Sequence, residues 1–264
     1  MSVPSHSSNV LDALRARARS ASAEAHTPFS GRPVGAALLL ADGQWVPGVR
    51  VESASYPLTI SALLGAFVTA ISGGRTDIRA AVLTRDLFPG EIDTLATALG
   101  VPVTAQAPDG AVFGAAPLPD VTDRLEPFAE PAPTSDEAGV QLARRAAERA
   151  HVPESNFRVG CAVVTNDGRV VPGCNVEFGE WPRGLCAERS ALAAAAAYGA
   201  GAIDRIYLSC PADPHGTPCG ACRQLLAEHA GGAPIVIDRG DGPVETTTAA
   251  ALLPSFFTGD SLRP

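Results

Sequence analysis

The sequence predicts an α/β protein with two tandem domains, each an α/β/α sandwich around a mixed sheet. The first observation is a repeat: Val34-Gly35 reappears as Val159-Gly160, and Pro57 reappears as Pro182, at one constant separation (159 − 34 = 125; 182 − 57 = 125). The second is that each repeat alternates short apolar runs with helical segments, a pattern typical of helices covering a sheet. A constant separation without gaps indicates a duplicated chain.

The predicted elements follow the same order in both copies. A helix rich in Ala and Arg comes first, and two apolar runs joined by an Asp-Gly turn then indicate a hairpin. A second helix and a buried strand follow, and the second copy adds a helix between Pro218 and Gly231-Gly232 and one more strand. The expected ranges are 10–24, 61–71, 137–150 and 186–198 for helices, and 79–84, 205–209 and 234–238 for strands.

Residues 119–134 have the composition of a linker, because they are rich in Pro, Glu and Ala and show no periodicity. We therefore expect a first domain at 1–118 and a second at 135–264.

Composition excludes several classes of function. The net charge is −8 and the chain has no Lys, so it lacks the basic stripe that grips a nucleic acid. No apolar run approaches the ~20 residues of a membrane span, and the N-terminus lacks a signal-peptide core. We expect a cytoplasmic protein that acts on a small molecule, without nucleic-acid or membrane partners.

All six cysteines lie in the second copy. Such clustering in a chain without an export signal favours metal binding or catalysis over disulfides. Three of them have no partner at ligand spacing and stand in or beside apolar runs, so we expect them to be buried small hydrophobes. These are Cys161, Cys174 and Cys210.

The other three cysteines form a zinc constellation with Glu188. Cys186 precedes Glu188 by two residues, while Cys219 and Cys222 stand about one helical turn apart. Three thiolates can hold Zn²⁺ and leave a fourth position for water, and the expected helix N-termini at both segments favour thiolate. A Cys-x-x-Cys pair alone is at least as often structural as catalytic. Its combination with Glu188, two residues after Cys186, points to catalysis.

These motifs are similar to those of the cytidine deaminase family in its three-cysteine form. The step from Asn175 to Cys186 is also kept (186 − 175 = 11). The best-matching stretches are 157–160, 173–177, 185–189 and 218–224.

The resemblance implies a role for several neighbours of the zinc ligands. Asn175 and Glu177 would hydrogen-bond the ribose, Phe157 would pack on the base, and the Ala187 backbone would orient the pyrimidine. Arg189 would hydrogen-bond a zinc-ligand sulfur and offset the net −1 charge of three thiolates and one zinc ion.

The resemblance also implies a reaction mechanism. Zinc lowers the pKa of its water, and Glu188 takes that proton, passes it to N3 and later protonates the departing amine. We expect hydrolytic deamination of cytidine and 2′-deoxycytidine to uridine and 2′-deoxyuridine, with release of ammonia. Phe178, Gly179 and Trp181 depart from the family pattern and leave open another modified or antibiotic cytosine nucleoside. An idle zinc-stabilised binding protein is disfavoured, because a structural site has no use for Glu188.

The first copy lacks every part of this constellation. At the constant offset, Ser61 replaces Cys186 and Leu63 replaces Glu188, and Arg50 stands at the position of Asn175. Residues 89–93 stand where the cysteine pair would be. We therefore expect a degenerate pseudo-domain and one zinc per chain.

Single-domain members of the family form tetramers, so the resemblance implies a homodimer of fused pairs that mimics a tetramer. The first copy keeps the segment 52–56 closer to the family pattern than does its counterpart. Its residues 53–56 either border a catalytic pocket or pack between the copies, and the sequence leaves both open.

Overall fold

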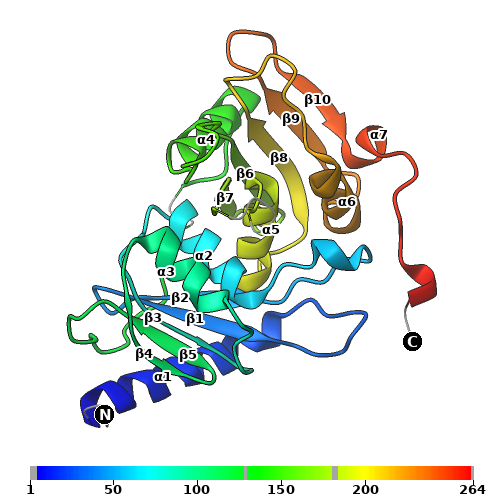
Figure 1. Cartoon of the computed structure of the whole chain (residues 1–264). Helices are drawn as coiled ribbons and strands as arrows, with labels where there is room; N and C mark the ends of the chain where they lie inside the picture. The colour runs from blue at the N-terminus through cyan, green and yellow to red at the C-terminus, as the bar shows by residue number, and fades with distance from the viewer. Residues whose placement is uncertain (1–4, 128–129, 180–183, 263–264) are drawn as a thin grey trace.

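In the computed structural model, residues 5–127, 130–179 and 184–262 are described. Each half folds into a five-stranded sheet with helices on both faces (Figure 1), as expected for two α/β/α units. The first half contains α1 (Ser5–Ala21), η1 (Ser22–Glu24), β1 (Gly35–Leu40), β2 (Trp45–Val49), η2 (Tyr56–Leu58), α2 (Ala62–Ser72), β3 (Ile78–Leu83), α3 (Glu91–Leu99), β4 (Val103–Ala107) and β5 (Gly110–Phe113). The second contains α4 (Asp136–Glu148), β6 (Gly160–Thr165), β7 (Val170–Cys174), α5 (Ala187–Ala197), β8 (Ile203–Ser209), α6 (Gly220–His229), β9 (Pro234–Asp238), β10 (Glu245–Thr248), α7 (Ala249–Leu252) and η4 (Asp260–Leu262).

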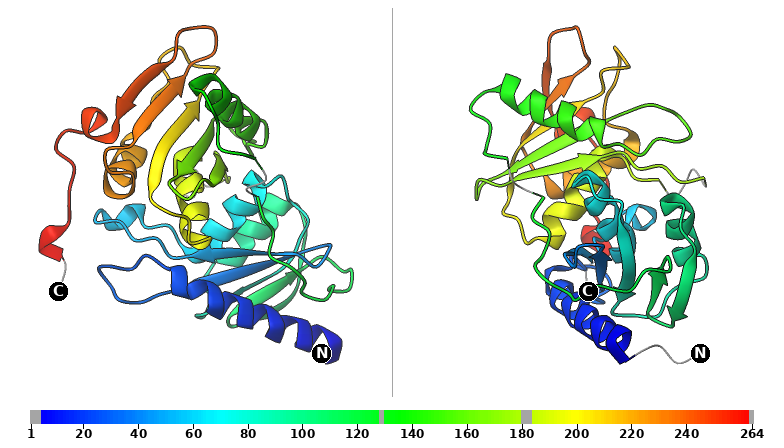
Figure 2. Two further views of the ribbon diagram at one scale, coloured as in Figure 1. Left: turned by 180° about the vertical axis from the view of Figure 1, so that it is seen from behind. Right: turned by 90° about the vertical axis from the view of Figure 1, so that its left-hand side faces the viewer.

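The first helix of each half covers the outer face of its sheet. Along α1, the buried residues Val10, Leu14 and Ala18 recur every four positions and form one apolar stripe. This stripe packs on the side chains of Leu39 and Val82 from β1 and β3. Figure 2 shows α1 lying along the outside of the first sheet, and α4 covers the second sheet in the same way.

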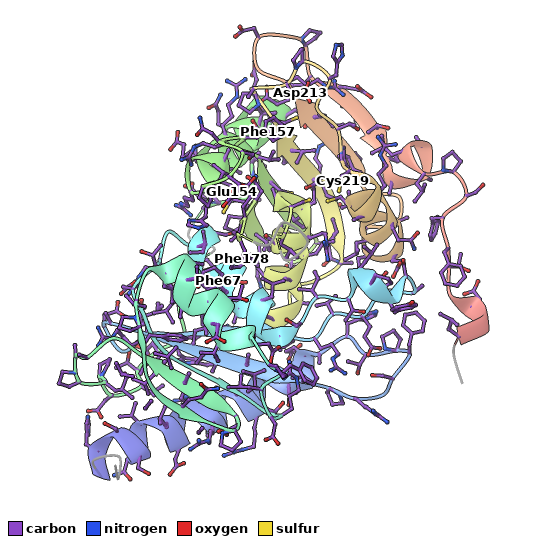
Figure 3. The ribbon with its side chains drawn as sticks, viewed as in Figure 1. Phe67, Glu154, Phe157, Phe178, Asp213 and Cys219 are labelled. Carbon is purple, nitrogen blue, oxygen red and sulfur yellow. The ribbon has the colours of Figure 1, made fainter. Side chains whose placement is uncertain are left out.

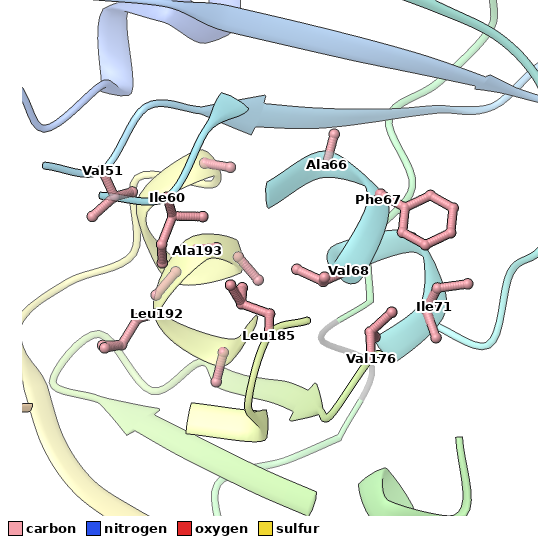
Figure 4. Packing of buried hydrophobic residues seen from close by; sticks show 14 of the residues in the cluster. Val51, Ile60, Ala66, Phe67, Val68, Ile71, Val176, Leu185, Leu192 and Ala193 are labelled. Carbon is pink, nitrogen blue, oxygen red and sulfur yellow. The ribbon is translucent and has the colours of Figure 1, made fainter. Parts of the chain in front are cut away.

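The inner helices α2 and α5 join the two halves into one core. Both are buried on nearly all sides, which is expected for helices that pack between two sheets and against each other. Figure 4 shows Phe67 and Val68 of α2 in the same cluster as Leu192 and Ala193 of α5. The small alanine side chains of α5 therefore allow close contact with the first copy.

The two sheets differ on one point: the second is mixed, as predicted, whereas the prediction of a mixed sheet is wrong for the first. The second sheet has the order β10-β9-β8-β6-β7 and is mixed, because α6 returns the chain so that β9 runs parallel to β8. The first sheet has the order β2-β1-β3-β5-β4, and its strand pairings in the described residues are antiparallel. A tight turn at Pro108-Asp109 forms a β4–β5 hairpin, which brings β5 back beside β3 in the opposite direction.

The duplication is visible in individual contacts. The Cβ atom that a side chain would add at Gly35 meets the carbonyl of Ala18, and that at Gly160 meets the carbonyl of Ala143, 125 residues later (143 − 18 = 125). In both copies only glycine allows the first helix to approach its sheet so closely.

Part of the segment 119–134 is bound to the first copy. The backbone N–H of Trp45 donates to the carbonyl of Asp123, and Leu125 donates to the carbonyl of Trp45. The hydroxyl of Tyr198, from the second copy, donates to the carbonyl of Leu125. Residues 123–125 therefore contact both halves. Within the described residues, no helix combines the length and apolar character that crossing a bilayer requires.

Candidate active site

A cavity of about 480 Å³ opens beside the N-termini of α5 and α6. The described residues that line it all come from the second copy and include Phe157, Asn175, Glu177, Cys186 and Cys219. Figure 3 shows Phe157 and Cys219 in this half, while Phe67 and Phe178 lie where the two halves meet. The cavity size is in the range of sites for small molecules.

The three cysteines of the predicted constellation lie together, and two of them, Cys186 and Cys219, line this cavity. Cys186 is the N-cap of α5, Cys219 is the N-cap of α6, and Cys222 lies in the first turn of α6. Their sulfur atoms all lie within 4.8 Å of one another, and the Cys186 and Cys219 sulfurs are 3.7 Å apart. Two thiolates bound at ~2.3 Å to one tetrahedral zinc would be separated by about 3.8 Å. The donor set therefore fits zinc.

The electrostatics of the three thiols favour one thiolate at Cys219. Hydrogen bonds from Cys186 and Cys222 lower the pKa of Cys219 well below that of a free thiol, and backbone N–H groups at the start of α6 add to this effect. The same contacts raise the pKa of Cys186 and Cys222. Clustered thiols at two helix N-termini thus form a site that already favours negative charge and a bound cation.

Glu188 lies in the first turn of α5, on the wall of the same cavity. Its side chain is only 4% exposed. Burial raises the pKa of Glu188 to about 7, because removal from water disfavours the carboxylate more than its backbone hydrogen bond favours it. A carboxyl group that titrates near neutral pH can both accept and donate a proton.

The side chain of Asn175 is hydrogen-bonded to the backbone of the segment that carries Phe157. The Asn175 amide nitrogen donates to the carbonyl of Phe157, at 2.8 Å, and the amide oxygen accepts from the N–H of Val159, at 2.8 Å. Asn175 therefore holds the chain segment that carries Phe157, and all three residues line the cavity.

Glu177 makes a similar set of contacts with the preceding loop. Its carboxylate accepts hydrogen bonds from the backbone N–H groups of Glu154 and Ser155, and from the Ser155 hydroxyl. In the first copy, Glu52 accepts the same three bonds from Phe29 and Ser30. This arrangement holds the loop in both copies, whether or not the copy has zinc ligands.

Arg189 points toward the first copy. Its Nη2 donates to the carbonyl of Leu58 at 3.1 Å, and the residue lines a second cavity, of about 300 Å³, beside Ser61 and Leu63. No hydrogen bond from Arg189 to a cysteine sulfur occurs among the described residues. Its charge nevertheless lowers the pKa of Glu188, though less than burial raises it.

The remaining cysteines are buried, as expected. Cys161 and Cys174 lie on β6 and β7, and Cys210 follows β8 and lines the cavity. Asp213 and Thr217 also line the cavity, although no motif in the sequence indicated them. They lie in a Pro- and Gly-containing loop directly before the cysteine pair. This position next to two metal-ligand candidates is the sequence feature that could have indicated them.

The residues that depart from the family pattern do not line the main cavity where they are described. Phe178 is buried and packs on Phe67 of the first copy, with ring centroids 5.6 Å apart. Gly179 lines a third cavity, beside α3. Trp181 lies outside the described residues.

The first copy places other side chains at equivalent points. Ser61 caps α2, and its hydroxyl accepts from the N–H of Leu64, as expected of a good N-cap residue. Leu63 is buried where the second copy has Glu188. Gly90 is the N-cap of α3, as Cys219 is of α6, and Asp93 stands three residues later, as Cys222 does.

Models of one protein family match both halves of the chain. A model of the cytidine and deoxycytidylate deaminase zinc-binding region matches residues 133–237, and another with the same description matches residues 2–87. A cytidine deaminase of Mycobacterium tuberculosis (strain ATCC 25618 / H37Rv) is 44% identical over 46% of this chain and 87% of its own length. One from Sporosarcina psychrophila is 37% identical over 45% of this chain and 88% of its own.

Solved structures of cytidine deaminases also resemble about half of the chain. The enzyme from Burkholderia pseudomallei is 40% identical, with a TM-score of 0.45, over 47% of this chain and all (100%) of that one. The enzyme from Mycobacterium tuberculosis is 39% identical, with a TM-score of 0.40, over 46% of this chain and 95% of that one. With family matches in both halves and curated relatives covered over most of their length, this chain belongs to the cytidine deaminase family, as a tandem duplication whose zinc constellation lies in the second copy.

Proposed function

We propose that this protein hydrolytically deaminates cytidine and 2′-deoxycytidine, forming uridine and 2′-deoxyuridine and releasing ammonia. The observation that carries the proposal is a cluster of three cysteine sulfurs beside a buried glutamate, with Cys186, Cys219 and Glu188 lining the same cavity. A purely structural zinc site would close its coordination with a fourth protein ligand and would not need that glutamate.

In this proposal, Cys186, Cys219 and Cys222 hold the zinc ion. When bound, zinc supplies a Lewis acid that activates water for attack on C4 of the cytosine ring. Glu188 acts as the proton carrier: its carboxylate accepts one proton of the attacking water and delivers it to N3. It then takes the remaining proton from the new hydroxyl group at C4 and transfers it to the departing amine. Its burial excludes bulk water from these transfers.

The substrate contacts are also part of the proposal. Phe157 packs on the base, and the Ala187 backbone orients the pyrimidine at the zinc end of the cavity. Asn175 and Glu177 face the ribose, and their hydrogen bonds to neighbouring loops hold both side chains in place before substrate binds. All four residues line the cavity, which supports these assignments.

Arg189 is assigned an electrostatic role. Three thiolates and one zinc ion carry a net charge of −1, and a guanidinium beside Glu188 reduces the cost of that charge. The Leu58 carbonyl fixes one end of the guanidinium from the first copy.

The packing of Phe178 weakens the alternative of a modified cytosine nucleoside. That alternative depends on Phe178, Gly179 and Trp181, yet Phe178 packs in the core between the copies instead of lining the cavity. The ordinary nucleosides therefore remain the better substrates.

A panel of free nucleosides tests the proposed reaction. Purified zinc-loaded protein should convert cytidine and 2′-deoxycytidine, with loss of ultraviolet absorbance and one ammonia released per turnover. Adenosine and cytidine monophosphate serve as comparison substrates. Turnover confined to a modified cytosine nucleoside, or none at all in zinc-loaded protein, would contradict the proposal.

The division of the chain and its location belong to the same proposal. We assign residues 1–118 to the inactive domain, 119–134 to the linker and 135–264 to the catalytic domain. We also assign the protein to the cytoplasm, where free nucleosides occur.

We further propose a homodimer that mimics a tetramer, with two working sites. Tyr56 supports this assembly, because its side chain is 84% exposed although it follows two buried residues of the retained segment, Ser53 and Ala54. Light scattering should give the mass of a dimer. Tyr56→Ala should raise KM or lower kcat by a few-fold (about 1 kcal/mol) without loss of zinc, and a fully active monomer would refute the assembly.

A further inference from the structure

The retained segment of the inactive copy is bound to the helix that carries two zinc ligands. Ser53 donates its hydroxyl to the Glu228 carboxylate at 2.8 Å, and the N–H of Ala54 donates to the other carboxylate oxygen at 3.0 Å. Ser53 and Ala54 are 2% and 3% exposed. In Figures 1 and 2 the segment before α2 lies beside α6. These are contacts between the copies, 175 and 174 positions apart in the chain.

The same carboxylate is part of a longer set of polar contacts on α6. Gln224, one turn earlier, donates its amide N–H to Glu228 and to the carbonyl of Phe257. Its amide oxygen accepts from the N–H of Phe257. The next residue after Glu228, His229, packs edge-on against His26 of the first copy, with ring centroids 4.9 Å apart. The C-terminal end of α6 is therefore fixed by directional contacts to the first copy and to the C-terminal segment.

The opposite end of α6 supplies Cys219 and Cys222. Six residues separate Cys222 from Glu228, which is about 9 Å along a helix. A tilt of about 3° over that length would move a sulfur by about 0.5 Å, whereas metal–ligand distances hold to about ±0.2 Å. Leu225 and Leu226 bury one side of α6, but burial of apolar surface has no direction and does not by itself fix tilt or rotation.

We propose that Glu228 is a positioning residue for the zinc site, and that the inactive copy, through Ser53 and Ala54, sets the orientation of α6. The inactive copy is thus part of the metal site's support without contributing a ligand. This inference rests on the proposed function, because it assumes zinc at Cys186, Cys219 and Cys222.

The test measures zinc affinity by competition with a chromophoric chelator, at a temperature where every variant is folded. Removing partners that orient metal ligands typically costs 10–100-fold in affinity, so Glu228→Ala should weaken zinc binding by about 10-fold. Ser53→Ala should weaken zinc binding less. The double variant should bind zinc as tightly as Glu228→Ala alone, because both changes remove the same hydrogen bond. In cobalt-substituted protein, the ligand-field bands should shift in Glu228→Ala.

Ser135→Ala is the matched control. Ser135 caps α4, on the other face of the sheet, through a hydrogen bond to the N–H of Ala138. Its loss should destabilise the protein by about 1 kcal/mol and leave zinc affinity and the cobalt spectrum unchanged.

The outcomes separate the two proposals. If the unaltered protein fails to bind one zinc or to deaminate cytidine, the proposed function itself fails. If it binds zinc and is active, but Glu228→Ala and Ser53→Ala bind zinc as tightly as it does, only the positioning role of Glu228 is overturned. Equal weakening by Ser135→Ala would also overturn it, since the effect would then be general destabilisation.

Discussion

The two copies share a first helix, a hairpin and an inner helix, but they differ in the side chains at two helix N-termini. Glu52 and Glu177 accept equivalent hydrogen bonds from the loops 29–30 and 154–155, although only the second copy has zinc ligands. The loop contacts therefore maintain the fold on their own account. A residue type kept in both copies is weaker evidence for catalysis than one that stands in the second copy alone.

The positions that differ show what catalysis requires. Cys186 and Ser61 are both N-caps, but only the serine makes a side-chain capping hydrogen bond. The thiol is a poor cap, and its use at this position is explained by metal binding. Leu63 in place of Glu188 lets α2 bury an apolar side chain where α5 must bury a titratable one. At these two positions the first copy therefore has residues that favour an ordinary capped, apolar helix.

The largest expected difference between the copies is in metal content. Elemental analysis should give one zinc per chain, and Cys222→Ser should abolish zinc binding and activity, because two thiolates cannot hold the metal tightly. The control introduces Ser61→Cys and Leu63→Glu into the first copy, which should not add a second zinc without a cysteine pair. Two zinc ions per chain in the unaltered protein would refute the contrast.

The acid/base residue should show the next largest effect. Glu188→Gln keeps the size of the side chain but cannot carry protons, so kcat should fall by ~10²–10⁴-fold, the usual contribution of general acid–base catalysis. Zinc content should be unchanged. Near-normal turnover in the zinc-loaded variant would exclude Glu188 as the proton carrier.

Position 178 also differs between the copies, because Phe178 stands where the first copy has Ser53 (178 − 53 = 125). The contact of Phe178 with Phe67 allows this difference to be tested. Phe178→Ala should reduce the free energy of unfolding by about 3–5 kcal/mol, as expected for a buried aromatic side chain, with little change in the KM for cytidine. Phe157→Leu is the matched variant: its side chain lines the cavity, so KM should rise by about 10-fold with a smaller loss of stability. A large change in nucleoside preference in a Phe178 variant would restore it as a specificity residue.

A smaller effect is expected from pH at the contact between the copies. Burial, with a contribution from the charge of His26, lowers the pKa of His229 from 6.5 to about 4, while Glu228 opposes the shift. Below pH 6.5 the unfolded chain binds this proton and the folded protein does not, so stability should fall as pH decreases from about 6.5 to 4. The full shift corresponds to at most about 3 kcal/mol.

Chemical unfolding of the protein and of His229→Gln across this pH range measures the effect. The difference between them cancels acid effects that both share, including loss of zinc. His215→Gln, at an exposed position, is the matched control for replacing a histidine with glutamine. Parallel curves for the His229→Gln variant and the unaltered protein would contradict the burial of a neutral histidine.

The sequence by itself determined the duplication, the alternation of helices and strands, and the residue types of the zinc constellation. The constant offset located Ser61 and Leu63 opposite Cys186 and Glu188, and the helix N-termini at both cysteine segments followed from local patterns. These features were accessible because periodicity, capping residues and ligand spacing are local properties of the chain.

Only the tertiary structure decided which partner each segment meets. No sequence pattern indicated the β4–β5 hairpin at Pro108-Asp109, and its return beside β3, which makes the first sheet antiparallel, is a long-range pairing. The contact of Glu228 with Ser53 and that of Phe178 with Phe67 join residues more than 100 positions apart. A local pattern shows that a side chain is buried, but the partner is selected by how whole helices and sheets pack, which no local pattern records.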